Sequence, residues 1–363
     1  MESIKKLNHY LCPPGNGVFT VHTAKENKEA LHKLLFDTSE PSQVEEIWRQ
    51  SLSSYKTETR PILLGVCLDT GGGIQRGANW GPLFIREHML KSIGAPNYYD
   101  IGDIRIIPHL LHDKYLNQET IQSCQDALYG GEKLSVSGLS IAEDVTDILY
   151  KEKKKIFSIG GDHSVSYPLV KSWIKAKKSE SKKIAIIHFD AHTDLMSKRL
   201  GIDICFGSWA YHMIELLETP SNLLQFGIRS SGQDKSYWES NLGVQQFWAN
   251  EFKDNFSKIK KDTIAYLKEN EIEEVYVSFD IDALDSKYAS ATGTPESNGL
   301  EPHTCIDLIQ SIASICKITG GDMVEVAPFV QSPQRSKLTP EPDTTIESAS
   351  LISRKIIEVM SES

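Results

Sequence analysis

The sequence predicts an α/β domain built on a mainly parallel β-sheet. From residue 61 onward, short apolar runs rich in Ile, Val and Phe alternate with longer amphipathic segments, and no internal repeat or low-complexity linker interrupts them. Such short apolar runs are typical of strands buried on both faces. Strands that alternate with helices need crossover connections, and these place helices on both faces of a parallel sheet.

The elements of this domain, residues 61–363, are predicted in chain order. Strands are expected at Ile62–Leu68, Ile104–Ile107, Ile156–Ile159, Ile184–Phe189, Leu223–Phe226, Val275–Phe279 and Met323–Val326. The helices expected between them include Ser164–Lys175, Glu251–Glu269 and Pro302–Cys316.

Residues 1–60 are expected to form an N-terminal extension with one helix. Ser42 and Glu45 have the spacing of a capping box at its start. One face of the helix then carries Val44, Ile47, Trp48 and Leu52. Such an apolar face indicates that the helix packs against the main domain as a structural cap.

Composition narrows the class of protein. Of the 363 residues, 40% are hydrophobic and 24% charged, as in a globular protein, and the net charge of −10 argues against nucleic-acid and membrane-surface partners. No apolar run approaches the roughly 18 residues that span a bilayer. The start, MESIKKLNHYL, lacks the apolar region of a secretory signal. The six cysteines form no C-x-x-C pair, so free buried thiols and a cytoplasmic location are expected.

Three predicted strands end in acids and histidines. Ile156–Ile159 is followed by Asp162 and His163, Ile184–Phe189 by Asp190-Ala191-His192-Thr193-Asp194, and Val275–Phe279 by Asp280-Ile281-Asp282. Ligands of open parallel sheets bind beyond the carboxyl ends of the strands. Single residues of this kind often cap turns or helices, as Asp162 and Ser164 could. Three clusters on three strand ends favour a shared site instead.

The residue types indicate a centre of two metal ions. In extended backbone, Asp190, His192 and Asp194 project to one side, and converging carboxylates resist ionisation unless cations neutralise them. Mixed carboxylate and imidazole ligands suit Mn²⁺, Zn²⁺, Fe²⁺ or Ni²⁺. Six ligands are too many for one catalytic ion with open positions, but they suit two ions that share carboxylates. The ligands are His163, Asp190, His192, Asp194, Asp280 and Asp282.

These three motifs, Gly160–Ser164, Asp190–Asp194 and Ser278–Asp282, resemble the signatures of the ureohydrolases, the family of arginase, agmatinase and formimidoylglutamase. The resemblance covers roughly residues 61 to 355. Further matching stretches are Arg76–Pro82 with Arg86, Asp100–Asp103, Gly293–Glu296 and Asp322–Pro328.

The resemblance implies a three-layer α/β/α fold, a homo-oligomer and two Mn²⁺ ions per subunit, with Ni²⁺ as the alternative. His163 and Asp194 would bind one ion and His192 and Asp282 the other, while Asp190 and Asp280 would bridge them. A hydroxide bridging the ions would attack the carbon of a small amidine or guanidine substrate and cleave its C–N bond. Asp194 would act as the catalytic proton carrier.

Two departures from the family pattern concern the substrate. Phe206 stands where arginases and agmatinases carry a proton-shuttling His, and His212, six positions later, is the candidate replacement. Thr304 stands where these enzymes carry a Glu that pairs with the guanidinium, and Glu301 is the candidate replacement. Without a carboxylate there, a guanidinium loses its bidentate partner.

Both departures resemble formimidoylglutamase-like branches, whose substrate ends in a glutamate moiety. Arg229 is the candidate cation for that moiety, with a structural ion pair as its alternative role. A hydrolase of agmatine, guanidino acids or guanidine that releases urea remains the second hypothesis. A catalytically inactive regulatory relative is the third, although all six ligand positions are filled. A deacetylase-like hydrolase is a further alternative, and it would differ by binding a single zinc ion. A dinucleotide-binding module is not supported, because Gly71-Gly72-Gly73 lacks the spacing of a dinucleotide-binding loop.

Overall fold

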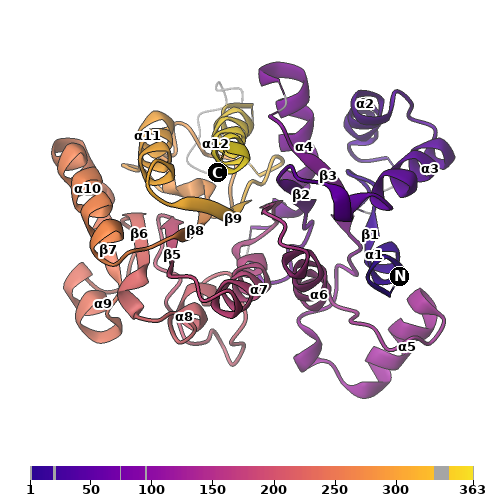
Figure 1. The fold of residues 1–363 in the computed structure, drawn as a ribbon, viewed down its shortest axis with the longest axis horizontal. Coiled ribbons are helices and arrows are strands. Elements are labelled where there is room, and N and C mark those ends of the chain that lie inside the picture. The colour runs from indigo at the N-terminus through magenta and orange to yellow at the C-terminus, as the bar shows by residue number, and fades with distance from the viewer. Residues whose placement is uncertain (1, 19–21, 74, 95, 331–342, 363) are drawn as a thin grey trace.

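A nine-stranded sheet forms the centre of the computed structural model, which describes residues 2–18, 22–73, 75–94, 96–330 and 343–362 (Figure 1). The strand order is β1-β3-β2-β4-β9-β8-β5-β6-β7, and neighbouring strands are parallel except β1 and β3. The described strands are β1 Leu11–Cys12, β2 Ile62–Gly65, β3 Tyr99–Ile104, β4 Ile156–Ile159, β5 Ile184–Phe189, β6 Leu223–Ile228, β7 Gln245–Trp248, β8 Glu274–Asp280 and β9 Lys317–Val324. The predicted α/β class is confirmed.

Helices cover both faces of this sheet. The described α-helices are α1 Glu2–Tyr10, α2 Lys25–Phe36, α3 Pro41–Leu52, α4 Gly81–His88, α5 Gln118–Tyr129, α6 Gly138–Lys151, α7 Ser166–Ser179, α8 Trp209–Ile214, α9 Lys235–Leu242, α10 Ala249–Glu269, α11 Pro302–Ala313 and α12 Asp343–Glu362. Helices α6, α7 and α8 share one hydrophobic core with the sheet, while α4, α10, α11 and α12 share a second. The result is three layers.

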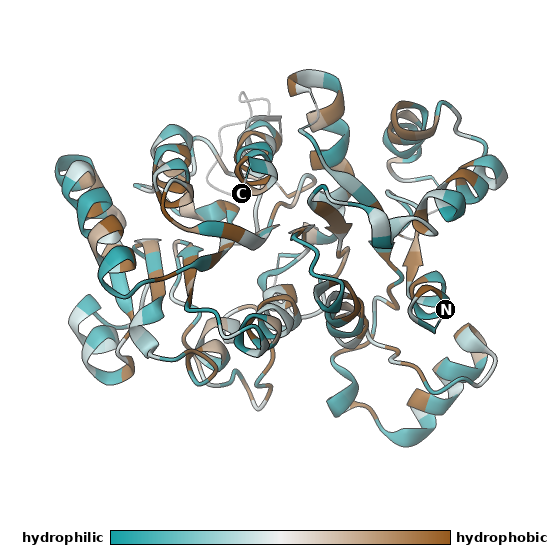
Figure 2. Cartoon of the chain, viewed as in Figure 1, coloured by the Kyte–Doolittle hydropathy of each residue, from teal (hydrophilic) through white to brown (hydrophobic). Residues whose placement is uncertain are grey.

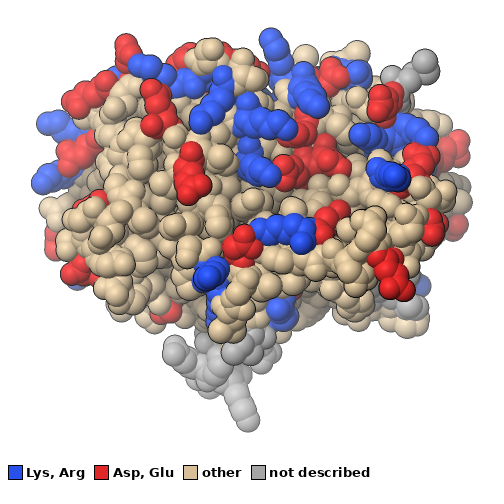
Figure 3. Space-filling view, turned by 90° about the horizontal axis from the view of Figure 1, so that it is seen from below, with Lys and Arg blue, Asp and Glu red and all other residues tan. Residues whose placement is uncertain are grey.

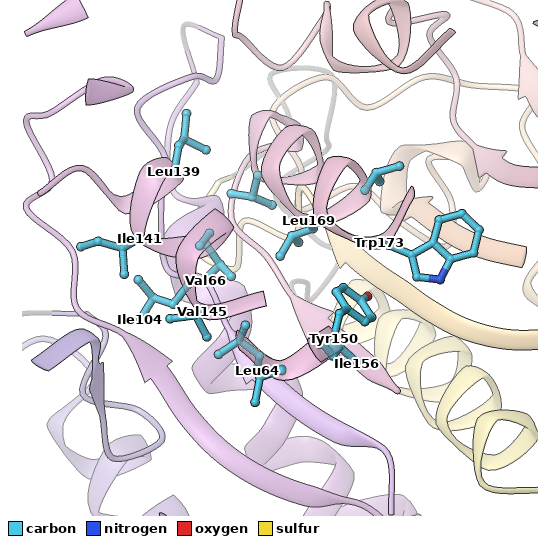
Figure 4. Packing of buried hydrophobic residues seen from close by; sticks show 14 of the residues in the cluster. Leu64, Val66, Ile104, Leu139, Ile141, Val145, Tyr150, Ile156, Leu169 and Trp173 are labelled. Carbon is cyan, nitrogen blue, oxygen red and sulfur yellow. The ribbon is translucent and has the colours of Figure 1, made fainter. Parts of the chain in front are cut away.

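Alternation along the strands supplies both cores. In β5, Ile184 and Ile186 belong to the first core, whereas Ala185, Ile187 and Phe189 belong to the second. Figure 4 shows the first core, where strand residues such as Leu64 and Ile156 meet α6 and α7. Apolar and polar residues share most helices in Figure 2, as expected of helices with one face on a sheet.

Strands β1 and β7 were not predicted, and two predicted strands lie several residues from their observed bounds. The predicted strand Ile104–Ile107 is wrong in register, because β3 begins at Tyr99. Its polar residues Asp100 and Asp103 are buried against Arg86, with nitrogen–oxygen distances of 2.8 and 2.6 Å, and these acids conceal the strand pattern. The predicted strand Met323–Val326 overlaps only the end of β9, which runs from Lys317 to Val324.

The sequence pattern did not predict the first half of β9, because this part of the strand contains closely packed glycines. A Cβ built on Gly320 would lie 2.4 Å from the ring of Tyr276, so the backbone there approaches an aromatic side chain too closely for another residue. Such glycines carry no apolar signal and so conceal the strand.

The N-terminal segment is more structured than predicted. Three helices precede residue 60 in the described part, not one, because the patterns of α1 and α2 contain few buried residues. Helix α3 begins at Pro41 with Glu40 at its N-cap, so the predicted capping box of Ser42 is wrong. Strand β1 adds this segment to the sheet edge by pairing with β3.

The described face of the surface carries charges of both signs, and the cysteines are free thiols. Figure 3 shows one face, on which basic and acidic side chains are interspersed. All six cysteines are unpaired; Cys124 is half-buried and the others are buried. Among the described residues, no helix is long and apolar enough to cross a membrane.

Candidate metal centre

The six predicted ligands come together at the carboxyl edge of the sheet. His163 follows β4, while Asp190, His192 and Asp194 follow β5. Asp280 ends β8, and Asp282 lies in the short turn after it. Strands β4, β9, β8 and β5 are consecutive neighbours, so their ends share one edge.

Backbone packing places His163 in this cluster. A Cβ on Gly161 would lie only 1.6 Å from the carbonyl oxygen of Leu68, so only glycine allows the two segments to approach so closely. The amide of Asp162 then donates to that carbonyl at 3.0 Å. The next side chain, His163, is thereby directed inward and buried.

The Nδ1 atom of His163 lies among three carboxylates. It is 3.2 Å from Oδ2 of Asp190 and 3.1 Å from Oδ2 of both Asp194 and Asp280. All four side chains are buried. Nevertheless, this nitrogen is among the buried polar atoms of the described residues that have no hydrogen-bond partner.

The contact of the other ring nitrogen, Nε2, indicates the tautomer of His163. Its Nε2 lies 3.0 Å from Oγ of Ser278, which itself donates to Oδ1 of Asp322 at 2.8 Å. Nε2 therefore carries the hydrogen and donates to Ser278. Neutral His163 then directs the lone pair of Nδ1 at three carboxylate oxygens, an arrangement that a cation stabilises.

A second ligand group adjoins the first. Nδ1 of His192 lies 3.4 Å from Oδ1 of Asp190 and 3.1 Å from Oδ2 of Asp282. Asp190 thus presents Oδ2 to His163 and Oδ1 to His192, as a carboxylate shared by two ions would. The geometry fits a metal centre with two positions.

Electrostatics supports the same fit. Burial, followed by the charges of Asp282 and Asp190, raises the pKa of Asp280 well above its ordinary value. Burial and the charge of Asp190 also raise the pKa of Asp194. Burial opposes ionisation of Asp190 too, but its interactions with the nearby rings of His163, His188 and His192 outweigh burial and hold its pKa well below the ordinary value. Crowded buried carboxylates of this kind are stabilised by bound divalent cations.

His188 is a part of the site that the sequence interpretation missed. Its Nε2 donates to Oδ2 of Asp190 at 2.9 Å, and its Nδ1 accepts from Nε2 of Gln225 at 2.9 Å. His188 lies in the buried run of β5, two positions before Asp190 and therefore on the same side. That alternation was the signal that could have identified it.

Trp209 is a second missed residue. Its Nε1 donates to Oδ2 of Asp194 at 2.9 Å, and its ring centroid lies 4.9 Å from that of His163. Asp194 has a positive φ of 51°, a conformation uncommon for residues other than glycine. The indole donor therefore fixes a ligand on a strained turn.

The predicted substrate residues lie outside the ligand cluster. The guanidinium of Arg229 donates to backbone carbonyls of residues 227, 282–284, 296 and 297. These contacts connect separate backbone segments. The partners are backbone carbonyls, whereas the structural alternative considered from the sequence was an ion pair. Glu301 and Thr304 line a separate cavity of about 830 Å³ beside α10, and no metal ligand lines that cavity.

The ring of His212, the candidate proton shuttle, has its described contacts with residues other than the predicted ligands. Its Nε2 lies 2.7 Å from the carbonyl oxygen of Asp203, and its ring contacts Tyr167, away from the ligand groups. The amide of Phe206 donates to the carbonyl oxygen of Gly71 at 3.0 Å, and its ring centroid lies 5.1 Å from the guanidinium carbon of Arg199.

The open side of the centre lies at His192. This side chain is 28% exposed, whereas those of the other ligands are at most 6% exposed. Oε1 of Glu296 lies 3.8 Å from its Nε2, and Oγ1 of Thr294 donates to Oδ2 of Asp282 at 3.0 Å. A carboxylate therefore borders the entrance.

Comparison with known proteins identifies the family. The model of the arginase family matches residues 60–354. The chain belongs to the arginase family. An agmatinase of Bacillus anthracis is 31% identical over 286 residues, covering 75% of this chain and 84% of the relative. The mitochondrial guanidino acid hydrolase of Homo sapiens is 29% identical, covering 73% and 70%.

Solved structures support the same arginase-family fold. Proclavaminate amidino hydrolase from Streptomyces clavuligerus superposes with a TM-score of 0.63 at 24% identity, covering 83% of this chain and 92% of that one. Formimidoylglutamase from Bacillus subtilis superposes with a TM-score of 0.64 at 20% identity, covering 84% and 89%.

Proposed function

We propose that this arginase-family protein is a two-metal hydrolase that cleaves a C–N bond in a small guanidine or amidine. The observation that carries the proposal is Nδ1 of His163, buried among the carboxylates of Asp190, Asp194 and Asp280 without a hydrogen bond. With the adjoining group of His192 and Asp282, these residues would hold two divalent ions, Mn²⁺ or Ni²⁺. Such ions supply positive charge that activates water and stabilises developing negative charge.

The chain's own groups supply the proton transfer. Oδ2 of Asp194 accepts a hydrogen bond from Nε1 of Trp209 and lies 3.1 Å from Nδ1 of His163. Its other oxygen, Oδ1, would therefore be the one that holds a proton. Through this oxygen, Asp194 would accept a proton and pass it to the departing amine. At the exposed side of His192, the carboxylate of Glu296 would attract a cationic guanidinium or amidinium head.

Two observations bear on the identity of the substrate, and each favours a different branch of the family. Relatives named agmatinase and guanidino acid hydrolase favour guanidino compounds. The Phe206 position favours the formimidoylglutamase-like branch on sequence grounds alone. Both branches share the cleavage of an amidine-type C–N bond. An inactive relative is disfavoured because all six ligands converge.

The test is metal content per subunit together with turnover. The protein is loaded with Mn²⁺ or Ni²⁺ and assayed with agmatine, arginine, guanidine, 4-guanidinobutanoate and N-formimino-glutamate, with release of urea, ammonia or formamide as the readout. Two ions and turnover of one substrate are expected. Fewer than two ions and no turnover would favour the regulatory alternative.

A further inference from the structure

A row of polar side chains crosses the buried sheet beside the proposed centre. Six neighbouring strands, β4, β9, β8, β5, β6 and β7, each contribute one residue, and each residue is paired in register with the next (Figure 1). In sheet order these residues are Ser158, Asp322, Ser278, His188, Gln225 and Gln246. All six are at most 1% exposed. Because burial of polar groups costs free energy, such a row indicates a specific role.

Gln225 connects the ligands to the outer strands of this row. Its Nε2 donates to Nδ1 of His188 at 2.9 Å and to the carbonyl oxygen of Thr193, within the ligand loop, at 2.6 Å. Its Oε1 accepts from Nε2 of Gln246 at 2.8 Å. Oε1 of Gln246 in turn accepts from Nε1 of Trp248 at 2.9 Å. A continuous chain of hydrogen bonds therefore leads from Trp248 to His188.

The two ends of this chain fix its direction. An indole N–H can only donate, so Gln246 turns its oxygen to Trp248 and its nitrogen to Gln225. A backbone carbonyl can only accept, so Gln225 turns its nitrogen to Thr193. Both ends impose the same amide orientations, and Nδ1 of His188 therefore faces a donor.

The hydrogen of the His188 ring is consequently on Nε2, which donates to Oδ2 of Asp190 at 2.9 Å. The other oxygen of Asp190, Oδ1, accepts from the backbone amide of His192 at 2.6 Å. One donor thus holds each carboxylate oxygen, and each oxygen keeps a second lone pair for an ion. The two donors set the plane of the carboxylate that the two ligand groups share.

We propose that Gln225 and Gln246 are positioning residues of the metal centre. They hold His188 in the tautomer that donates to Asp190, the carboxylate shared by the two ion positions. This inference rests on the proposed two-metal function. Groups behind the ligands orient them and tune metal affinity, and hydrogen bonds aligned along a chain polarise one another. The chain begins at Trp248, which is half-buried on the edge strand β7.

Metal affinity tests the role of Gln225. Gln225→Met keeps a side chain of similar length but has no donor, and it should weaken Mn²⁺ binding by about 10- to 100-fold. Gln125→Met is the matched control, because Gln125 is also buried and donates to the carbonyl of Leu134 at 2.8 Å, which belongs to no ligand. Titration followed by electron paramagnetic resonance of free Mn²⁺ would measure affinity without turnover. Equal losses in the two variants would overturn the proposal.

A double-mutant cycle tests the route through His188. Once His188→Ala has removed the ring, Gln225→Met should weaken Mn²⁺ binding less than it does in the wild type. The same fold-change in both backgrounds would show that Gln225 acts independently of His188 and would overturn the relay. Gln246→Met, one step further out, should weaken binding by a smaller factor, and an unchanged affinity would overturn the role of Gln246.

Nitrogen-15 NMR of the full chain, free of paramagnetic ions, tests the tautomer directly. Among the eleven histidines, the His188 signal is the one that disappears in His188→Ala. The wild type should carry its proton on Nε2, and a proton on Nδ1 would overturn the proposal. Neither the NMR nor the Mn²⁺ titration needs turnover. A wild type that binds two ions but hydrolyses no substrate would therefore reject the proposed reaction and not the relay.

Discussion

The hydrogen-bond chain behind His163 shows how buried groups prepare a ligand. Oδ2 of Asp322 accepts from Ser166 and Tyr276, and its Oδ1 accepts from Ser278, which lies 3.0 Å from Nε2 of His163. The chain fixes both the ring orientation and the tautomer that leaves Nδ1 free for a cation. Ser278 is therefore expected to tune metal affinity without being a ligand.

Replacing Ser278 with Ala should test this role. The variant loses the acceptor for His163, and metal affinity or activity should fall by about 10- to 100-fold. Metal titration followed by mass spectrometry and an activity assay would measure both. Ser172→Ala is the matched control, because Ser172 is equally buried but bonds to the carbonyl of Glu143 in α6. Equal losses in the two variants would indicate a general packing effect.

Asp69 provides a pH-dependent prediction. Burial, followed by the charge of Asp162, raises its pKa to about 6 from an ordinary value of 3.8. A raised carboxyl pKa stabilises the fold below the unfolded pKa, and this stability is lost as pH rises from about 4 to 6. Asp69→Asn should match the wild type near pH 4 and gain up to about 3 kcal/mol in free energy of unfolding at pH 7.

Urea unfolding at several pH values would measure the effect at Asp69. Asp254→Asn removes an exposed carboxyl on α10 and should show no such crossover. A constant difference between Asp69→Asn and wild type at every pH would contradict the prediction.

At the scale of elements, Arg229 connects β6 to the loop that carries Asp282 and Thr294. Its guanidinium engages six carbonyls, and the loop in turn supplies the hydrogen bond from Thr294 to Asp282. Arg229→Met should lower the free energy of unfolding by about 2 kcal/mol or more, because buried acceptors lose their donor. Metal content should fall with it.

Arg229→Lys separates shape from charge. Lysine keeps the positive charge but lacks the planar fork, so it should restore little stability. Chemical denaturation and metal analysis would measure both variants. Unchanged stability with a higher KM for anionic substrates would instead support the substrate-binding role predicted from the sequence.

The elements also show what could be predicted. Strands β4 and β5 matched their predicted bounds because each is an uninterrupted apolar run, and the ligands follow at their ends. Strand β3 was displaced because tertiary pairing with Arg86 permits buried acids, which a local pattern does not reveal. His188 and Trp209 were missed because a buried histidine or tryptophan is ordinary in a core until its partner is known.

At the scale of the whole molecule, residues ahead of position 60 complete the sheet and its core, while the arginase-family match begins at residue 60. Trp48 is buried, and its Nε1 donates to the carbonyl of Ile101 in β3 at 3.0 Å. Leu7, Tyr10 and Leu52 belong to the same core as α6 and α7. The segment that precedes the family match is thus joined to the edge strand of the domain.

Removal of residues 1–58 should therefore destabilise the whole domain. The truncated chain would expose β3 as an unpaired edge together with the apolar surface under Trp48, and both favour aggregation.

Within the full chain, Trp48→Ala should lower the free energy of unfolding by about 3 to 5 kcal/mol, because a buried aromatic side chain leaves a cavity. Its neighbour Ile47 is 40% exposed, and Ile47→Ala should change stability by less than about 0.5 kcal/mol. Thermal unfolding with size-exclusion chromatography would compare the three proteins. A truncated chain that stays monodisperse and unfolds at the wild-type temperature would contradict this stabilising role of the segment.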